Sequence, residues 1–233
     1  MSTRVFVVGT DTEVGKTSVC CALLGAATMR GLRLRPFKPA QSGPPGPDSD
    51  VARLLAAAGL PADQGEQACP HQYPEPIAPG IAESIAPFLQ APASSTTPCP
   101  ALGVAATSLD KWESATDAAI TLIEGAGGLH VPMPGGSWQP QWIQALSRQT
   151  VVVGREGLGT INHTLCTING LRDLGRPPLG FILCQVTEAR DASAAQNASI
   201  IAAASSVPHL GTLPYAASVG PAPELLDALL ARL

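Results

Sequence analysis

Hydrophobic residues of this chain fall into short continuous runs, and amphipathic stretches lie between them. The runs contain few polar positions, as expected for strands that are buried on both faces of a parallel sheet. They are Arg4–Val8, Leu32–Lys38, Ala119–Glu124, Thr150–Gly154, Leu179–Leu183 and Leu210–Pro214. Helical patterns occupy Lys16–Arg30, Asp50–Ala58, Asn162–Leu174, Ala192–Ala204 and Pro223–Leu233. This alternation predicts an α/β fold, a doubly wound and mainly parallel sheet with helices on both faces.

The composition narrows the class of protein. The 233 residues suit one domain, spanning positions 1–233, that can bury its own core. A net charge of −4 without any run rich in lysine or arginine argues against a nucleic-acid partner. The apolar runs are too short to cross a membrane, and the first residues contain no signal-peptide core. We therefore expect a cytoplasmic protein whose six cysteines, none of them in a C-x-x-C pair, stay reduced. The Pro/Ser/Thr-rich segment Gln90–Pro100 is expected to be an exposed loop.

The strongest motif lies between the first strand and the first helix. It reads GTDTEVGKT over residues 9–17, which is one residue longer than the usual phosphate-binding loop. Backbone N–H groups would surround the phosphate oxygens, and Gly15 lets the backbone approach them closely. Lys16 would place its ammonium on the β- and γ-phosphates, and the Thr17 hydroxyl would bind Mg²⁺. The residues expected to contact the nucleotide here are Glu13, Val14, Gly15, Lys16, Thr17 and Ser18.

Three further patches follow strand ends, and right-handed crossovers bring those ends to one edge of the sheet. Lys38 opens KPAQSG after the second strand and would bind a developing anion, unless it is a solvated surface lysine. Glu124 opens EGAGG and fits the carboxylate that holds Mg²⁺, although it could also begin a solvent-exposed loop. Residues 157–163, GLGTINH, are either a second anion site at a helix N-terminus or a plain helix start.

The motifs GTDTEVGKT, KPAQSG, EGAGG and GLGTINHT, in this order, resemble those of the dethiobiotin synthetase family, and the likeness extends from Arg4 to Tyr215. The resemblance implies a homodimer with the P-loop NTPase fold. It also implies a reaction in which 7,8-diaminononanoate, CO₂ and ATP give dethiobiotin, ADP and phosphate. One amine is first carbamated. The carbamate then attacks the γ-phosphorus to form a carbamic–phosphoric anhydride, and the second amine closes the ureido ring.

The resemblance also implies roles for individual substrate-binding residues. Lys38 matches the family's carbamate-binding lysine, and Ser42 matches its substrate-binding serine. Thr12 and Lys16 would hold the carbamate and the migrating phosphoryl group, where negative charge accumulates in the transition state. The substrate's terminal carboxylate would reach the other subunit of the dimer. Its expected contacts there are Gly159, Thr160, Ile161 and Asn162.

The metal and nucleobase sites follow from the same resemblance. The implied Mg²⁺ ligands are Thr17, Asp50 and Glu124. Asp48 competes with Asp50 for this role, and we expect Asp48 at the helix N-cap instead. The other residues expected around the ATP are Gly125, Ala126, Gly127, Gln185, Leu213, Pro214 and Tyr215. The family often has Asn-Asp where this chain has Cys184-Gln185, and although the Gln185 amide can hydrogen-bond a base, the nucleobase preference stays open.

Two other classes of protein remain as alternatives. One is a related P-loop ATPase with another acceptor, such as an amidating ligase or a partition-type ATPase. The partition type carries a second lysine early in the loop, which Thr10–Val14 lacks, and amidating relatives usually carry a glutaminase domain. The other is a degenerate nucleotide-binding paralogue. The presence of Lys16, Lys38 and Glu124 argues against it, whereas Cys184-Gln185 keeps it open.

Overall fold

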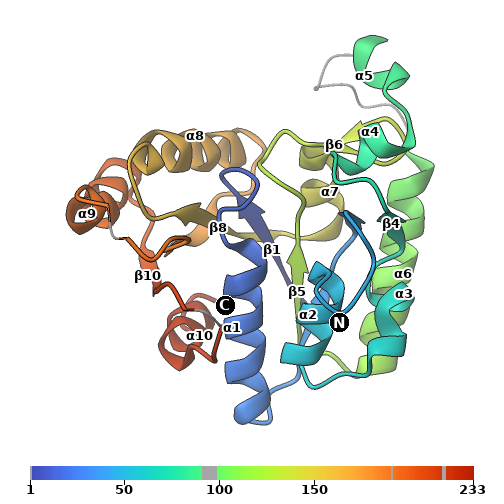
Figure 1. The fold of residues 1–233 in the computed structure, drawn as a ribbon, viewed down its shortest axis with the longest axis horizontal. Helices are drawn as coiled ribbons and strands as arrows, with labels where there is room; N and C mark the ends of the chain where they lie inside the picture. The colour runs from blue at the N-terminus through green and yellow to red at the C-terminus, as the bar shows by residue number, and fades with distance from the viewer. Residues whose placement is uncertain (1, 91–98, 190, 217–218) are drawn as a thin grey trace.

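The computed structural model describes residues 2–90, 99–189, 191–216 and 219–233, and its centre is a six-stranded sheet (Figure 1). The strand order is β10-β9-β8-β1-β5-β2, and every neighbouring pair is parallel. The strands are β1 (Thr3–Gly9), β2 (Leu34–Phe37), β5 (Ile120–Glu124), β8 (Gln149–Arg155), β9 (Pro178–Cys184) and β10 (His209–Leu213). The predicted parallel α/β sheet is therefore confirmed.

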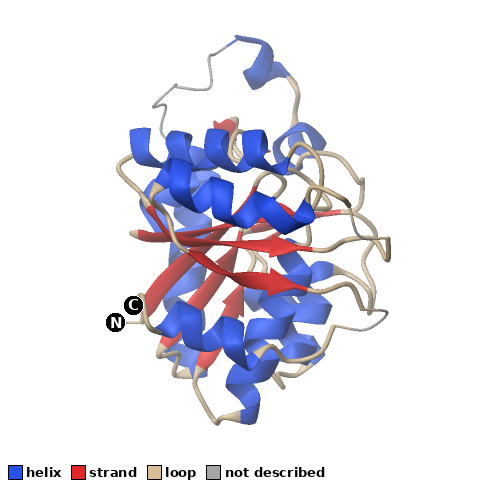
Figure 2. Ribbon diagram, turned by 90° about the vertical axis from the view of Figure 1, so that its left-hand side faces the viewer, coloured by secondary structure: helices blue, strands red, loops and turns tan. Residues whose placement is uncertain are grey.

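Helices cover both faces of this sheet, as Figure 2 shows. One face packs against α1 (Lys16–Met29) and α10 (Pro223–Leu230). The other packs against α6 (Pro100–Thr116), α7 (Gln139–Leu146), α8 (Thr160–Asp173) and α9 (Ala194–Ser205). Helix α2 (Asp50–Ala57) lies near the β2 edge and contributes side chains to both cores. The prediction of a doubly wound sheet is confirmed by this arrangement.

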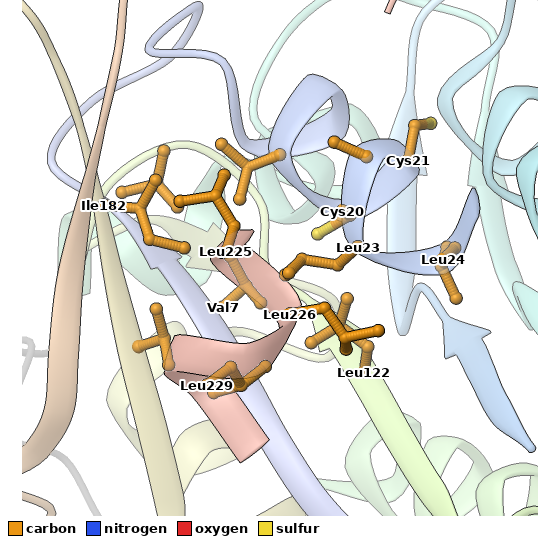
Figure 3. Close-up of a cluster of buried hydrophobic side chains, with 14 of the residues drawn as sticks. Val7, Cys20, Cys21, Leu23, Leu24, Leu122, Ile182, Leu225, Leu226 and Leu229 are labelled. Atoms are coloured by element: carbon orange, nitrogen blue, oxygen red, sulfur yellow. The ribbon is translucent and has the colours of Figure 1, made fainter. Parts of the chain in front are cut away.

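The two cores follow from the two-residue period of the strands. In β1, Val5 and Val7 join the core under α1, whereas Phe6 and Val8 join the core on the opposite face. All four side chains are buried, which is why this strand reads as a continuous apolar run. On the α1 face, leucines of α10 close the core against α1 (Figure 3).

Several elements were not predicted. Helix α6 has 17 residues and buries Ala105, Leu109 and Trp112, whose i, i+4, i+7 spacing is a helical stripe. The short elements are the 3₁₀ helix Ala62–Gln64, α3 (Gly65–Ala68), α4 (Pro79–Glu83) and α5 (Ala86–Gln90). Two small sheets pair β3 (Ala40–Ser42) with β4 (His71–Tyr73) and β6 (Pro132–Met133) with β7 (Ser137–Trp138). Of the predicted loop Gln90–Pro100, residues 91–98 lie outside the described residues.

Other details of the prediction change only locally. Helix α8 begins two residues before the predicted Asn162, because Gly159 caps it. The expectation that Asp48 caps α2 was wrong, since the N-cap is Ser49, whose Oγ accepts the N–H of Ala52 at 3.4 Å. All six cysteines are free thiols. Among the described helices, none is both long enough and apolar enough for a bilayer crossing.

Candidate active site

The phosphate loop joins β1 to α1 (Figure 1). It ends in Gly15, which caps α1 in the left-handed conformation at φ 92° and ψ 19°. A side chain at this position would be strained, and its Cβ would collide with Cys184 from the end of β9. Glu13 also has a positive φ of 56°, an uncommon conformation for a residue other than glycine. The loop backbone is therefore held in left-handed conformations at Glu13 and Gly15, which strain a residue other than glycine.

The two side chains expected to contact transferred groups lie differently in this loop. Lys16 is buried, and its Nζ donates a hydrogen bond to the carbonyl oxygen of Asp11 at 2.9 Å. Burial lowers the pKa of Lys16 to about 8. Thr12 is exposed at the loop tip, where its N–H donates to Asp11 Oδ1 at 2.7 Å. The Val14 side chain points into the α1 core, so only its backbone remains for a phosphate contact.

Four residues from four separate segments meet at the start of α1. Lys38 Nζ lies 2.6 Å from Glu124 Oε1 and 2.9 Å from Asp50 Oδ2. The Thr17 hydroxyl lies 2.8 Å from the same Glu124 oxygen and 3.1 Å from Asp50 Oδ1. Lys38 follows β2, Glu124 ends β5 and Asp50 begins α2. Lys38 and Glu124 are only 3% and 1% exposed. Lys38 is therefore not a solvated surface lysine, and Glu124 does not begin a solvent-exposed loop.

Electrostatics stabilise this cluster in its charged form. Burial alone would lower the pKa of Lys38, but the carboxylates of Glu124 and Asp50 outweigh burial and raise that pKa. Burial opposes ionisation of Asp50 as well, yet the Lys38 ammonium holds the pKa of Asp50 below its usual value. The second oxygen of Glu124, Oε2, is buried and has no hydrogen-bond partner. An unpartnered carboxylate oxygen of this kind has the chemistry of a cation ligand.

The cluster fits a magnesium ion that is shared with phosphates. No group of three or more His, Cys, Asp or Glu side chains in the described part of the chain forms a metal site by itself. Mg²⁺ commonly uses one or two carboxylates and takes its remaining ligands from substrate phosphates and water. The Thr17 hydroxyl lies within hydrogen-bond distance of both Asp50 and Glu124, and all three groups are hard oxygen donors. These three groups would bind Mg²⁺ together with phosphate oxygens of a nucleotide, which would supply further ligands.

A cleft of about 680 Å³ opens above these residues at the carboxyl ends of the strands. The predicted residues that line it are Thr12, Glu13, Gly15, Lys16, Thr17, Ser18, Lys38, Ser42, Asp50, Glu124, Gly125, Ala126, Gly127, Gln185, Leu213, Pro214 and Tyr215. Cys184 and Val186 line it as well, beside Gln185. A single cleft thus collects the phosphate loop, the carboxylates, Lys38 and the wall expected for a nucleobase.

The turn before α8 does not join this cleft. Gly159 and Ile161 are absent from its lining, as are the other two residues of that predicted set. Thr160 is buried, and its N–H already donates to the carbonyl oxygen of Gly157 at 3.2 Å. Asn162 is exposed on the first turn of α8. The predicted carboxylate site therefore lies outside this cleft.

Among the cleft residues that sequence reasoning did not assign, Gln41 and Arg53 have polar side chains. Gln41 is buried, and its Oε1 accepts the N–H of Val51 at 2.8 Å, so it holds the start of α2 beside Asp50. Arg53 lines the cleft one helical turn after Asp50. The i, i+3 spacing from Asp50 and the place of Gln41 within KPAQSG were the available signals.

Comparison with known proteins agrees with this architecture. A family model described as AAA domain matches residues 3–223. Chloroplast FtsY from Physcomitrella patens superimposes with a TM-score of 0.53 at 14% identity, covering 98% of this chain and 65% of that one. The MinC:MinD cell division complex of Aquifex aeolicus gives 0.53 at 12% identity, covering 99% and 86%. The fold and the phosphate loop define a P-loop NTPase.

Curated relatives identify the family within that class. A protein from Anaeromyxobacter dehalogenans named ATP-dependent dethiobiotin synthetase BioD is 38% identical over 97% of this chain and 96% of its own length. One of the same name from Bacillus cereus is 33% identical over 96% of this chain and 88% of its own length. The chain belongs to the dethiobiotin synthetase family, as its four motifs predicted.

Proposed function

We propose that this protein is an ATP-dependent cyclo-ligase that converts 7,8-diaminononanoate and CO₂ into dethiobiotin, with ADP and phosphate as the other products. The observation that carries the proposal is the meeting of Lys16, Lys38 and Glu124 at one cleft. The relatives named ATP-dependent dethiobiotin synthetase support the same activity. One domain spanning residues 1–233 would carry it.

The reaction needs three bond-forming steps, and none requires a covalent enzyme intermediate. A neutral substrate amine attacks CO₂ and loses a proton, which gives a carbamate anion. A carbamate oxygen then attacks the γ-phosphorus and displaces ADP, leaving a carbamic–phosphoric anhydride. The second amine attacks the anhydride carbonyl, closes the five-membered ureido ring and releases phosphate and a proton. The protein's task is to hold two amines, one carbon and one phosphorus in line.

Lys38 is suited to hold the carbamate. An ammonium group has three N–H donors, and Glu124 and Asp50 engage two of those on Lys38. The third remains for a carbamate oxygen within the cleft that Lys38 lines. Its raised pKa keeps the charge at any physiological pH, so the donor strengthens as the anion forms. Ser42 lines the same cleft and would add a hydroxyl contact to the substrate.

Lys16 and Thr12 would serve the phosphoryl group. One of the three N–H donors of Lys16 is bonded to the Asp11 carbonyl oxygen, which leaves two for the β- and γ-phosphate oxygens. Thr12 lies exposed at the loop tip and lines the cleft, where its hydroxyl can reach the carbamate. Both groups would act by meeting charge that grows in the transition state.

Thr17, Asp50 and Glu124 would hold Mg²⁺, which when bound would neutralise charge on the β- and γ-phosphates. The nucleobase would lie against Gln185, Leu213, Pro214 and Tyr215, which form the far wall of the cleft. The Gln185 Nε2 donates to the carbonyl oxygens of Thr187 and Glu188 at 3.1 and 3.2 Å, which leaves Oε1 to accept from a base.

A homodimer would complete the site, with the substrate carboxylate bound at Gly159–Asn162 of the other subunit. The exposure of Asn162 and the absence of this turn from the cleft support that reading, because a carboxylate bound there would have to come from another subunit's cleft. We further propose that the enzyme works in the cytoplasm on small-molecule substrates, without nucleic-acid or membrane partners. The net charge of −4 supports this.

The proposal is tested by phosphate release from ATP with Mg²⁺, bicarbonate and 7,8-diaminononanoate. We expect release that depends on the diamine, with dethiobiotin detected by mass spectrometry. Release without the diamine would indicate another P-loop ATPase, and no release would indicate a degenerate paralogue. In the same assay, Lys38→Ala should lose most turnover while ATP still binds, because Lys38 serves the carbamate.

Two matched variants sharpen the Lys38 test. Lys111→Ala removes an exposed lysine of α6 and should leave turnover unchanged. Lys38→Arg keeps the positive charge that neutralises Glu124, so it separates loss of the fold from loss of the carbamate donor. Near-normal turnover in Lys38→Ala would remove this assignment.

A further inference from the structure

A fully buried glutamine lies behind the loop that follows Glu124. Gln139 is the first residue of α7, is 0% exposed and does not line the cleft. Its Oε1 accepts the N–H of Ala126 at 2.7 Å, and its Nε2 donates to the carbonyl oxygen of Gly128 at 2.6 Å. One side-chain amide therefore bridges both ends of a glycine-rich turn, much as a neighbouring strand would.

The opposite side of the same loop packs against the phosphate loop. A Cβ built on Gly9 would lie 2.6 Å from the carbonyl oxygen of Gly127 and 2.6 Å from Lys16 Nζ. A Cβ on Gly128 would lie 3.2 Å from the carbonyl oxygen of Thr10. The glycine loop 125–128 thus occupies a narrow space between Gln139 and the P-loop, with no room for a Cβ on Gly9 at their contact.

Gln139 also packs closely against Gly125, the first residue of the loop. A Cβ on Gly125 would lie 2.8 Å from Gln139 Oε1 and 2.7 Å from a ring carbon of Phe6. Gly125 directly follows Glu124, whose carboxylate accepts hydrogen bonds from Lys38 and Thr17. If the Gln139 side-chain amide moved, Gly125 would move with it. The adjacent Glu124 carboxylate would then be displaced from Lys38 and Thr17.

From these contacts we propose that Gln139 is a positioning residue for phosphoryl transfer, acting through the loop 125–128, a role that rests on the function proposed above. The loop lines the same cleft as Lys16, Lys38 and Glu124, which under the proposed function would face the transferred group, whereas Gln185 and Tyr215 would face the nucleoside. Because Gly125, Ala126 and Gly127 also border the expected ATP, a misplaced loop should slow the transfer step far more than it weakens nucleotide binding.

Two variants and a matched control test the role. Gln139→Met keeps the length of the side chain and removes both hydrogen bonds. Gln139→Glu keeps an acceptor for Ala126 but sets a second oxygen against the carbonyl of Gly128. Gln144→Met is the control, because Gln144 lies on the same helix and bonds only peripherally, to the carbonyl oxygen of Leu174 at 3.3 Å.

We expect kcat to fall roughly tenfold to a hundredfold in both Gln139 variants at a temperature where they are folded, since a misplacement of about 1 Å can cost that much. The dissociation constant for a fluorescent ATP analogue should stay within about threefold of wild type, and Gln144→Met should match wild type in both. An unchanged kcat with only a lower melting temperature would make Gln139 purely structural. Equal losses in kcat and affinity would assign the loop to nucleotide binding instead.

Amide hydrogen exchange tests the positioning without any substrate. Peptides that cover residues 124–131 should lose protection in Gln139→Met, because the Ala126 N–H is released to solvent. Equal protection in wild type and variant would overturn the proposal even if turnover fell. Were the wild type to release phosphate without the diamine, the proposed function would fail, and exchange would still decide whether Gln139 fixes the loop.

Discussion

The turn after β1 and the turn after β8 both end in a glycine that caps the following helix. Gly15 has φ 92° and ψ 19°, and Gly159 has φ 91° and ψ −13°, so the two caps share the left-handed conformation. Neither cap is supported by a side-chain hydrogen bond. The surroundings differ: Val14 before the first glycine is 2% exposed, whereas Leu158 before the second is 76% exposed.

The comparison teaches that a helix N-terminus becomes a phosphate site through what surrounds it. Both turns present backbone donors and the positive end of a helix dipole. Only the first adds a lysine, a second lysine across the cleft and two carboxylates for a metal ion. The second turn has the exposed Leu158 in place of such groups, and for it we proposed a single carboxylate as ligand instead of a triphosphate.

Replacing Lys16 by Met should give the largest effect, because it makes the first turn as free of lysine as the second. We expect kcat for diamine-dependent phosphate release to fall about 10²- to 10³-fold, the loss typical of one preorganised donor. Pre-steady-state mixing with quenching would measure the transfer step directly. Arg155→Met, beside the second turn, is the matched change and should leave the transfer step intact. A loss below tenfold in Lys16→Met would mean that the backbone supplies most of the stabilisation.

The same substitution, glycine to alanine, can be made at the helix cap of each turn. Alanine at either position costs about 1–2 kcal/mol for the left-handed conformation. At Gly15 the new Cβ would also collide with Cys184, whereas at Gly159 its nearest neighbour is His163 Cε1 at 3.8 Å. Gly15→Ala should weaken binding of a fluorescent ATP analogue by at least tenfold. Gly159→Ala should leave that binding unchanged and raise KM for the diamine.

The results for Gly15→Ala and Gly159→Ala together test whether the two turns bind different groups. If Gly159→Ala weakened nucleotide binding as much as Gly15→Ala, the second turn would belong to the nucleotide site. A Gly15→Ala, Cys184→Gly double variant isolates the collision, because it removes both the Sγ and the Cβ of Cys184 that the new Cβ would meet. Partial recovery of affinity would assign part of the loss to Cys184, and no recovery would assign it to the backbone.

These two turns also mark how far sequence reasoning reached. Both lie directly after apolar strands and contain motifs with known mechanics, so their place at the sheet edge was predictable. The approach of Lys38 to Glu124 followed from the same logic, since each ends a strand of one parallel sheet. The contact of Cys184 with Gly15 was out of reach, because it depends on the packing of β9 against the P-loop rather than on spacing.

Elements without a strand-end motif were harder to predict. Helix α6 was missed although Leu109 and Trp112 are at helical spacing, because small and polar residues dilute the apolar stripe around them. Gln139 gave no signal, since a buried glutamine and an exposed one look alike in sequence. Its function comes from backbone partners, Ala126 and Gly128, that only the folded loop brings together.

The smallest predicted effect concerns pH and applies to the first turn alone. Burial lowers the pKa of Lys16 to about 8, so the ammonium loses its proton as pH rises through that value. A neutral amine attracts phosphate weakly, and the terminal phosphate of ATP is already ionised above pH 7.5. The affinity of the free enzyme for an ATP analogue should therefore change little between about pH 7.5 and about pH 8. Above about pH 8, affinity should fall, at most about tenfold per pH unit.

Lys16→Arg separates this titration from other pH effects. Arginine stays protonated in proteins, so the variant should bind the nucleotide with an affinity that does not fall between pH 8 and pH 9.5. Binding measured by fluorescence across this range, without the diamine, excludes ionisation of the substrate amines. If wild type and variant fell in parallel, the loss would come from another group. The buried lysine would then stay charged throughout, and the contrast between the two turns would rest on geometry alone.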